Sequence, residues 1–386
     1  MTIDKFLPFA LPELGQEEID EVVDSLRSGW ITTGPKAKQF ETDFAELLGG
    51  SIECISVNSA TSGLHLALEA IGVGAGDEVI IPSYTFTATA EVIRYLNATP
   101  VFVDVNAHDF NISVDAIKAA ITPKTKVIVP VHFAGQSCDM DEIISTAKKH
   151  GIKIVEDAAH ALPTKYNGKY IGQLESDVTV FSFYANKTMT TAEGGMVVTK
   201  NSEIASRCKI MRLHGISRDA FDRYTSTKPS WYYEIVAPGF KYNMPDICAA
   251  IGIHQLRRLS GFQVKREQMA ELYAKELAGL PLGLPSVSRS NDQHAWHLYP
   301  IQLLPEAGIS RDKFIEAMAE LGIGCSVHFI PLHLQPYWRD TYNLNALDFP
   351  VSQKLFEREV SLPLYTRMTT DDLERVVTAV KKVLFN

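Results

Sequence analysis

A lysine, a carboxylate and a run of hydroxyl side chains are the residues of this sequence whose types and spacing could do chemistry. Lys187 lies in "SFYANKTMTTAEGG", just after an apolar run. Asp157 ends another apolar run, "IKIVEDA". Thr61 and Ser62 stand at the expected start of a helix, in "NSATSG". An amine can form a Schiff base, a carboxylate can keep a ring nitrogen protonated, and hydroxyls beside free backbone N–H groups can bind phosphate.

Each of these stretches also has an ordinary structural explanation. Ser59 could simply cap the helix that follows it, and Asp157 could cap the helix after its strand. Side chains alternate along a strand, so only one of Glu156 and Asp157 should face a ligand. A lysine chosen at random usually lies in water. Taken singly, none of these residues establishes a site.

Together, the three stretches fit the requirements of pyridoxal 5'-phosphate. This cofactor needs an amine for its Schiff base, a carboxylate beside its pyridine nitrogen so that the ring accepts electrons, and donors for its phosphate. Lys187, Asp157 and the segment around Thr61 answer one requirement each. We therefore predict a pyridoxal phosphate site, with pyridoxamine phosphate as the form that carries the amino group.

Buried strands and the helices between them must hold these residues in place. Runs rich in Val and Ile predict strands at 77–83, 99–105, 126–135, 152–158, 178–183 and 194–199. Helical patterns occur at 15–29, 60–71, 88–98 and 139–151. Apolar runs without polar alternation are typical of parallel strands buried on both faces. Ligands bind beyond the carboxyl ends of such strands, which is where Asp157 and Lys187 fall.

The pattern changes after about residue 250, where a long charged helical segment leads into a Pro/Ser-rich stretch. Beyond it we expect, in order, a strand, a helix, a strand and a helix, at 295–304, 310–323, 325–330 and 369–385. This pattern indicates an α+β unit. We therefore expect two domains, a large α/β domain at 1–250 and a small C-terminal domain at 251–386.

Composition and charge narrow the kind of protein. Lys and Arg number 37 against 46 Asp and Glu, a net charge of -9 without a basic cluster, which disfavours a nucleic-acid partner. No apolar run is long enough to span a bilayer, and the N-terminus lacks the pattern of a secretion signal. The five cysteines are scattered without a CxxC pair, so neither disulfides nor a zinc site is expected. We expect a cytoplasmic protein that binds neither metal nor membrane.

Several motifs resemble, in the same order, those of the DegT/DnrJ/EryC1/StrS sugar aminotransferases, a branch of the fold type I pyridoxal phosphate enzymes. They include "VEDAAHAL", "FSFYANKTMTTAEGGMVVT", "GFKYNMPDICAAIGIHQL" and "VHFIPLH", and they cover nearly the whole chain. The resemblance implies a mainly parallel seven-stranded sheet flanked by helices, with a smaller α+β domain. Within the family the chain is most similar to the UDP-4-amino-4-deoxy-L-arabinose–oxoglutarate aminotransferases, through "HGISRDAFDRY", "PGFKYN" and "HAWHLYPI".

The resemblance also implies roles for individual residues. Lys187 matches the Schiff-base lysine, unlike the dehydratase branch with its histidine, and Asp157 matches the partner of the pyridine nitrogen. The other implied cofactor contacts are Thr61, Ser62 and Ser182 at the phosphate, Phe86 stacked on the ring and His160 beside it. His328 in "VHFIPLH" resembles a substrate-side histidine.

Family members are homodimers with shared active sites, and "GFKYN" resembles the loop that reaches the partner subunit's site. Lys241 and Asn243 are therefore implied contacts of the substrate and of the cofactor phosphate. Many members carry Asn and Arg at these two positions. The most similar subfamily has Trp where this chain has Phe86.

The implied reaction moves the amino group of glutamate, which leaves as 2-oxoglutarate, to a nucleotide-linked 4-keto sugar. The product would serve lipopolysaccharide or a related glycan. The same residues would support amination at C3 of a 3-keto sugar. A noncatalytic sensor on the same fold is the alternative from another class, but a sensor has no need of Lys187, Asp157 and the phosphate residues together.

Overall fold

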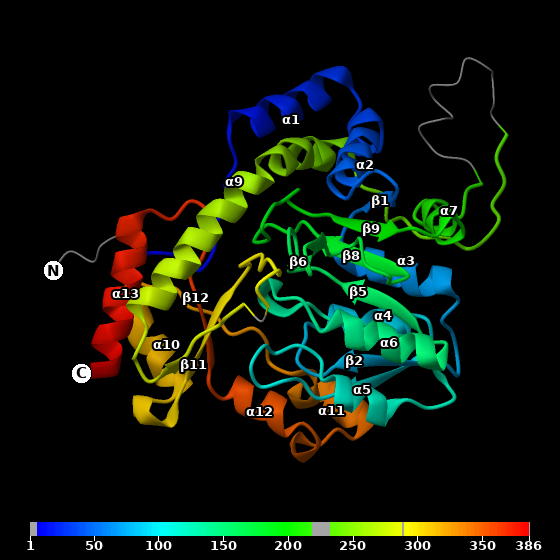
Figure 1. Cartoon of the computed structure of the whole chain (residues 1–386). Coiled ribbons are helices and arrows are strands. Elements are labelled where there is room, and N and C mark those ends of the chain that lie inside the picture. The colour runs from blue at the N-terminus through cyan, green and yellow to red at the C-terminus, as the bar shows by residue number, and fades with distance from the viewer. Residues whose placement is uncertain (1–5, 218–231, 288, 386) are drawn as a thin grey trace.

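The computed structural model describes residues 6–217, 232–287 and 289–385, and a seven-stranded sheet forms its centre (Figure 1). The strand order is β1-β9-β8-β5-β4-β2-β3. The strands are β1 (Glu53–Val57), β2 (Glu78–Pro82), β3 (Thr99–Val103), β4 (Thr125–Ile128), β5 (Lys153–Asp157), β8 (Val178–Ser182) and β9 (Gly195–Thr199). Strand β9 runs opposite to the other six strands, which all run in the same direction, so the predicted mainly parallel sheet is confirmed.

Helices cover both faces of this sheet, as expected for strands that are apolar on both sides. The helices on one face are α2 (Pro35–Leu47), α5 (Val114–Ala120) and α6 (Met140–His150). Those on the other face are α3 (Ala60–Ile71), α4 (Ala88–Tyr95) and α7 (Ser202–Met211). Successive strand residues contribute to opposite cores: Ile154 packs with the first set and Val155 with the second.

The C-terminal part has a separate small sheet with a core of its own. Its strands are β10 (Leu282–Gly283), β11 (Tyr299–Leu303) and β12 (Glu359–Leu362), which pair antiparallel. The helices α10 (Arg311–Glu320) and α13 (Thr370–Phe385) pack on them together with the later part of α9 (Asp246–Glu276). Figure 1 shows α9 running from beside α1 and α2 to beside α13. The expected domain boundary at residue 250 falls inside α9, and the division into two domains stays a prediction.

The remaining described elements lie at the margins of these two parts. They are α1 (Gln16–Ser28), α11 (Pro336–Tyr342), α12 (Pro350–Phe356) and the short paired strands β6 (Lys165–Tyr166) and β7 (Lys169–Tyr170). Helix α1 ends where Gly29 adopts a left-handed conformation with φ of 81°, at the stop that the sequence predicts. Its apolar face is unusual, because Ile19 and Leu26 remain more than half exposed.

Three expectations about elements were wrong or incomplete. The segment 325–330 is not a strand, because only Ser326 forms an isolated bridge, with Ser361, before the chain leaves the sheet edge. Strand β4 ends at Ile128, so the predicted strand at 126–135 is too long. Strands β1 and β12 were not predicted. In the "HGISRDAFDRY" motif, positions 218–224 lie outside the described residues.

Candidate active site

A cavity of about 520 Å³ opens beyond the carboxyl ends of β5 and β8. Strands β5 and β8 are parallel neighbours, with Asp157 opposite Val180, so Asp157 and the turn after Ser182 meet at one edge of the sheet. Of the ten residues assigned from the sequence, seven line this cavity: Thr61, Phe86, Asp157, His160, Ser182, Lys187 and His328. Ser62, Lys241 and Asn243 do not.

Asp157 is the buried carboxylate at the bottom of the cavity. Its two oxygens accept hydrogen bonds from the Thr89 hydroxyl (2.8 Å) and from the Ala159 N–H (3.1 Å). Burial raises the pKa of Asp157, and the Thr89 and Ala159 hydrogen bonds oppose that rise. Glu156 points to the other side, where it contacts His132 at 2.9 Å. Of these two carboxylates, only Asp157 therefore lines the cavity, in agreement with the expected alternation along the strand.

Lys187 projects from a turn that the backbone holds firmly. Its N–H donates to the Tyr184 carbonyl (3.0 Å), Thr191 N–H donates to the Phe183 carbonyl (2.9 Å), and the Thr188 hydroxyl donates to the Leu162 carbonyl. No described residue forms a hydrogen bond or an ion pair with the Lys187 amine. Burial lowers the pKa of Lys187 to about 8, and the Asp157 carboxylate opposes part of that shift. An amine in this state is a usable nucleophile near neutral pH.

The start of α3 also lines the cavity, through Ser59, Ala60 and Thr61. Ser59 caps the helix by accepting from the Ser62 N–H (3.1 Å), which confirms the structural explanation given for Ser59. Ser182 pairs with Gly195 across β8 and β9. A Cβ atom at Gly195 would lie 2.8 Å from the backbone nitrogen of Ala60, so glycine there lets the sheet edge touch the helix start.

This close contact puts the Ser182 hydroxyl and the first N–H groups of α3 on one side of the cavity, with Thr61. Helix N-termini with nearby hydroxyls are suited to phosphate. Ser62 is different, because its hydroxyl donates to Asn58 Oδ1 at 2.6 Å and its side chain is buried outside the lining. A phosphate contact from the Ser62 side chain remains a prediction.

Aromatic rings form one wall of the cavity. Phe86 is 57% exposed and its ring lies 5.8 Å from that of Phe329. Phe329 in turn stacks on His160, with ring centroids 5.8 Å apart and an interplanar angle of 28°. An exposed ring at the mouth of a cavity leaves one face free for a planar ligand, which is how Phe86 is predicted to act.

His160 has one ring nitrogen already assigned by the backbone. Its Nδ1 accepts from the Ala134 N–H at 3.2 Å, and burial lowers its pKa well below the usual histidine value. The neutral ring therefore carries its hydrogen on Nε2 and can donate there. His297 lies against it, with ring centroids 4.3 Å apart, and also lines the cavity.

Three further lining residues were missed by sequence reasoning. Asn186 Oδ1 is buried without a hydrogen-bond partner among the described residues, and so is His297 Nδ1. Glu193 lies on the lining beside Gly194. The available signals were the position of Asn186 next to Lys187 and the position of His297 inside the "HAWHLYPI" motif, and neither assigns a role to the side chain.

Lys241 and Asn243 lie away from the cavity of their own chain. The Lys241 amine donates to Asn243 Oδ1 at 2.7 Å, and Asn243 Nδ2 donates to the Thr33 hydroxyl. Lys241 is exposed. In one chain, therefore, the "GFKYN" segment does not reach the site.

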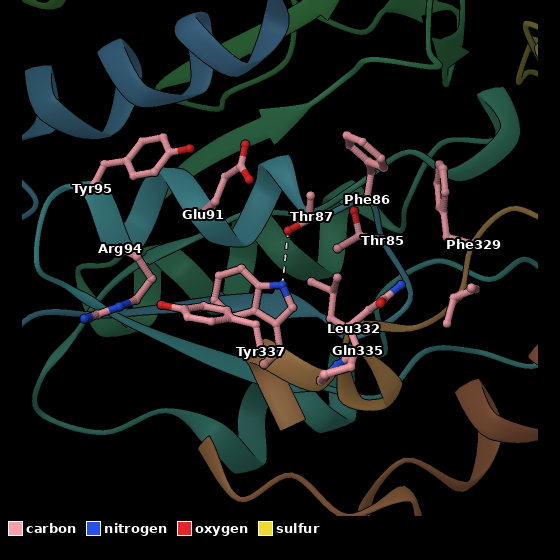
Figure 2. Close-up of a pocket in the computed structure, with 13 residues that line it drawn as sticks. Thr85, Phe86, Thr87, Glu91, Arg94, Tyr95, Phe329, Leu332, Gln335 and Tyr337 are labelled. Carbon is pink, nitrogen blue, oxygen red and sulfur yellow. Dashed lines mark hydrogen bonds between the residues drawn. The ribbon is translucent and has the colours of Figure 1, made fainter. Parts of the chain in front are cut away.

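A second hollow, of about 660 Å³, continues outward from the aromatic wall and shares Thr85, Phe86 and Phe329 with the inner cavity. Figure 2 shows its far end, where Arg94 from α4 lies beside Tyr337 from α11. Trp338 also lines the outer hollow and donates its indole N–H to the Thr87 hydroxyl at 3.1 Å. The outer hollow therefore combines flat aromatic surfaces with one positive side chain, Arg94, and one carboxylate, Glu91.

The described residues hold no group of three or more metal-ligating side chains that could bind a metal ion. No helix in the described part of the chain is long and apolar enough to cross a membrane.

The inner cavity has the features that pyridoxal phosphate requires. It presents an unpaired amine, a buried carboxylate, a helix start with hydroxyls and an exposed aromatic face, all at the carboxyl edge of a mainly parallel seven-stranded sheet. This fold and this arrangement define the fold type I class of pyridoxal phosphate enzymes. Within that class, the chain belongs to the DegT/DnrJ/EryC1/StrS aminotransferase family, whose profile matches residues 12–381.

Two curated relatives and one solved structure show how close the similarity is. The chain is 50% identical over 385 residues to an uncharacterized protein, MJ1066, of Methanocaldococcus jannaschii, covering 100% of this chain and 99% of that one. It is 45% identical over 381 residues to the spore coat polysaccharide biosynthesis protein SpsC of Bacillus subtilis, covering 98% and 97%. Spr1654 of Streptococcus pneumoniae, named as a candidate sugar aminotransferase, superposes in its PMP form with a TM-score of 0.91, at 36% identity over 98% of this chain and 99% of that one.

Proposed function

We propose that this protein is a pyridoxal phosphate-dependent aminotransferase that moves the amino group of glutamate to a nucleotide-linked 4-keto sugar. The observation that carries the proposal is the Lys187 amine and the Asp157 carboxylate in one cavity of a chain that belongs to an aminotransferase family. The Spr1654 relative has been solved in PLP and PMP forms, which supports the same cofactor here. When bound, pyridoxal phosphate supplies an electron-accepting ring that stabilises a carbanion at the substrate carbon.

Lys187 has two roles in this proposal. Its amine would hold the cofactor covalently and, once displaced by an amino substrate, would move the proton from the substrate carbon that bears nitrogen to C4′ of the cofactor. A pKa of about 8 leaves about a tenth of the amine neutral at pH 7, so a proton acceptor is available without a separate base. In the second half of the reaction, the Lys187 ammonium returns a proton to the sugar carbon.

Asp157 and the lining residues orient the cofactor. The buried carboxylate pairs with the protonated ring nitrogen, and the added positive charge offsets the burial that raises the pKa of Asp157. Ser182, Thr61 and the start of α3 hold the phosphate, and Phe86 covers one face of the ring. His160 would have its Nε2–H free to donate to the cofactor, because its Nδ1 accepts from the Ala134 N–H. Together these residues would hold the cofactor in a fixed orientation relative to the substrate.

The outer hollow supports a sugar carried by a nucleotide. A sugar at Lys187 would leave its diphosphate and base in the hollow beyond Phe86, where Arg94 offers a charge and Tyr95, Tyr337 and Trp338 offer flat surfaces. The SpsC relative acts in polysaccharide biosynthesis, which supports an amino sugar made for a cell-surface glycan. The proposal of amination at C4 rather than C3 rests on the resemblance to the 4-amino-arabinose enzymes. This chain differs from them in having Phe86 where they have tryptophan.

The proposed working form is a homodimer in the cytoplasm. Among the described residues that line the cavity, Lys187 is the only lysine or arginine, whereas glutamate carries two carboxylates. Lys241 from a second chain would supply the missing charge. The exposed Ile19 and Leu26 on α1 offer an apolar face for the contact. All five cysteines are free thiols, as is usual in a reducing compartment.

Two experiments test the function. Borohydride reduction of the purified holoenzyme should fix the cofactor on Lys187, identified by peptide mass, and K187A should abolish the label. A label elsewhere, or a protein that binds no cofactor, contradicts the site.

Glutamate should then aminate one member of a panel of nucleotide 4-keto and 3-keto sugars, with 2-oxoglutarate released in equal amount. Amination of a 3-keto sugar alone contradicts the C4 assignment. If the protein is labelled by borohydride but aminates no sugar of the panel, the result favours the noncatalytic sensor.

A further inference from the structure

His328 reaches the cavity from a segment that strand β12 holds in place. The backbone of Ser326 pairs with that of Ser361, by hydrogen bonds of 3.1 and 2.8 Å, before the chain turns into the cavity. Two residues on, the His328 N–H donates to Glu359 Oε2 at 3.0 Å. Glu359 is completely buried. A buried carboxyl on β12 therefore fixes the backbone of a cavity residue.

The same carboxyl also reaches the His328 ring through a hydroxyl. Glu359 Oε1 lies 2.5 Å from Ser361 Oγ, and Ser361 Oγ lies 3.0 Å from His328 Nδ1. His328 Nε2 has no hydrogen bond to any described residue, and His328 lines the cavity. Nε2 is thus the ring nitrogen left for a ligand.

A hydroxyl has a single hydrogen, so this chain of three groups can run in two directions. When Ser361 donates to Glu359, it must accept from His328 Nδ1–H, which leaves Nε2 as an acceptor. When Glu359 donates to Ser361, the hydroxyl donates to His328 Nδ1, and the ring hydrogen sits on Nε2. Oε2 is already an acceptor for the His328 N–H, so a carboxyl proton belongs on Oε1.

We propose that Glu359 is a positioning residue that, through Ser361, sets which ring nitrogen of His328 carries the hydrogen. It thereby decides whether His328 presents a donor or an acceptor to the substrate. The donor state suits a sugar oxygen or a phosphoryl oxygen, and only this choice of partner rests on the proposed function.

The direction at neutral pH follows from the surroundings of Glu359. Burial raises the pKa of Glu359 to about 8, and the hydrogen bonds from the Ser361 hydroxyl and the His328 N–H, followed by the charge of Arg311 on α10, only partly oppose this. The other titratable groups that face it are the buried Tyr84 and Cys325, whose pKa values Glu359 helps to raise. Burial also lowers the pKa of His328 to about 4, so its ring is neutral. Below pH 8 the Glu359 carboxyl is protonated and His328 donates from Nε2. Above pH 8 the direction of the hydrogen bonds reverses, and Nε2 becomes an acceptor.

The test reads the tautomer directly, by ¹⁵N NMR of histidine-labelled holoenzyme, with the His328 signals assigned by their loss in H328Q. Wild type should carry the hydrogen on Nε2 at pH 7 and on Nδ1 at pH 9. E359Q should keep it on Nε2 at both values, because an amide N–H donates to Ser361 at any pH. S361A should abolish the transition. E357Q, which removes an exposed carboxylate two residues away, should behave as wild type.

A single tautomer throughout in wild type, or a transition in E359Q like that of wild type, overturns the proposal. If E359Q does not fold, the wild-type titration and S361A decide the matter. The KM for the keto sugar should rise about tenfold from pH 7 to pH 9 in wild type and stay level in E359Q, the loss of one hydrogen bond to a charged oxygen. Failure to aminate any sugar would refute the proposed function and leave the NMR result standing.

Discussion

At the scale of single residues, the candidate site contains two ionisable groups, Lys187 and Asp157, whose charged forms are disfavoured by burial. The Lys187 amine has no hydrogen-bond or ion-pair partner among the described residues, and burial lowers its pKa. Asp157 is buried with its pKa raised. Buried groups of this kind can pair with complementary groups of a cofactor. Until the cofactor binds, they lower the stability of the folded protein.

The first prediction is that Lys187→Met makes the cofactor-free protein more stable. The pKa of Lys187 is about 8 in the folded chain and about 10.5 in the unfolded one. Its ammonium therefore opposes folding fully below pH 8, and the penalty disappears between pH 8 and 10.5. We expect a gain of about 2 kcal/mol at pH 7, discounted for partial solvent contact, and no gain near pH 10.5. Thermal and urea unfolding at both pH values measure it.

Lys124→Met is the matched control, since Lys124 is an exposed lysine. It should leave stability within about 0.5 kcal/mol of wild type. Equal or lower stability of K187M at pH 7 would show that the Lys187 ammonium carries no penalty in the fold.

At the scale of elements, the contact between β9 and the start of α3 shapes the end of the cavity that we propose holds the cofactor phosphate. Gly195 allows it, because its missing side chain leaves room for Ala60 and Ser59. The neighbouring strand β8 then brings Ser182 to the same end, and the turn after β8 brings Lys187. Cofactor affinity and local packing are therefore linked at this glycine.

The second prediction is that Gly195→Ala weakens both. The new Cβ would meet the Ala60 nitrogen at 2.8 Å and the Phe181 oxygen at 2.9 Å, and neither backbone atom can swing aside. We expect a loss of about 2–4 kcal/mol in the free energy of unfolding and a Kd for pyridoxal phosphate raised at least about tenfold. Denaturant unfolding and an absorbance titration with the cofactor measure these.

Gly74→Ala serves as the control, because a Cβ there meets nothing within 4 Å and the backbone is not left-handed. It should be neutral or stabilising by about 0.5 kcal/mol. If G195A binds the cofactor as tightly as G74A, the close approach of β9 and α3 is irrelevant to the phosphate.

Elements also show what sequence alone could and could not give. The Val/Ile runs of β2, β3, β5, β8 and β9 predicted the sheet because parallel strands are buried on both faces. Strands β1 and β12 were not predicted because buried polar residues, Ser56 and Ser361, interrupt their apolar pattern. The segment 325–330 was wrongly predicted as a strand, because after the single bridge at Ser326 the chain leaves the sheet and places His328 and Phe329 in the cavity lining.

The candidate site followed the same physical limits. The proximity of Asp157 and Lys187 could be predicted from the sequence, because the carboxyl ends of parallel strands lie at one edge of a sheet. Whether the Ser62 hydroxyl faces the cavity or donates to Asn58 depends on its rotamer, and no pattern in the sequence reveals it. Phe329 and His297 come from distant segments that only tertiary packing places beside His160.

At the scale of the whole molecule, the surface of α1 predicts association. Ile19 and Leu26 belong to the apolar face of α1, yet they are 51% and 57% exposed, while Glu18 and Ser25 are the buried positions of that helix. An apolar helix face turned outward usually meets another subunit.

The third prediction is that Ile19→Glu with Leu26→Glu gives a monomer. Wild type should sediment at about twice the chain mass of 42.8 kDa. The double variant should sediment at the mass of one chain, because two carboxylates on each copy would be buried against each other. Leu347→Glu is the control: Leu347 is 83% exposed on a short turn, and its variant should stay dimeric. A monomeric wild type, or a dimeric double variant, contradicts the role of α1.

The last prediction concerns whether two chains build each site. Lys241 and Asn243 lie outside the cavity of their own chain, so in a shared site they must serve the partner. K187A and the double variant K241A/N243A should each be inactive alone. In the heterodimer of the two, one site combines intact Lys187 from one chain with intact Lys241 and Asn243 from the other, and the second site lacks both. The purified heterodimer, isolated through two different affinity tags, should therefore recover about half of the wild-type rate.

A heterodimer of K187A with wild type should also show half of the wild-type rate and serves as the calibration. If Lys241 and Asn243 acted within their own chain, the mixed heterodimer would stay inactive, because the subunit with intact Lys187 would lack them.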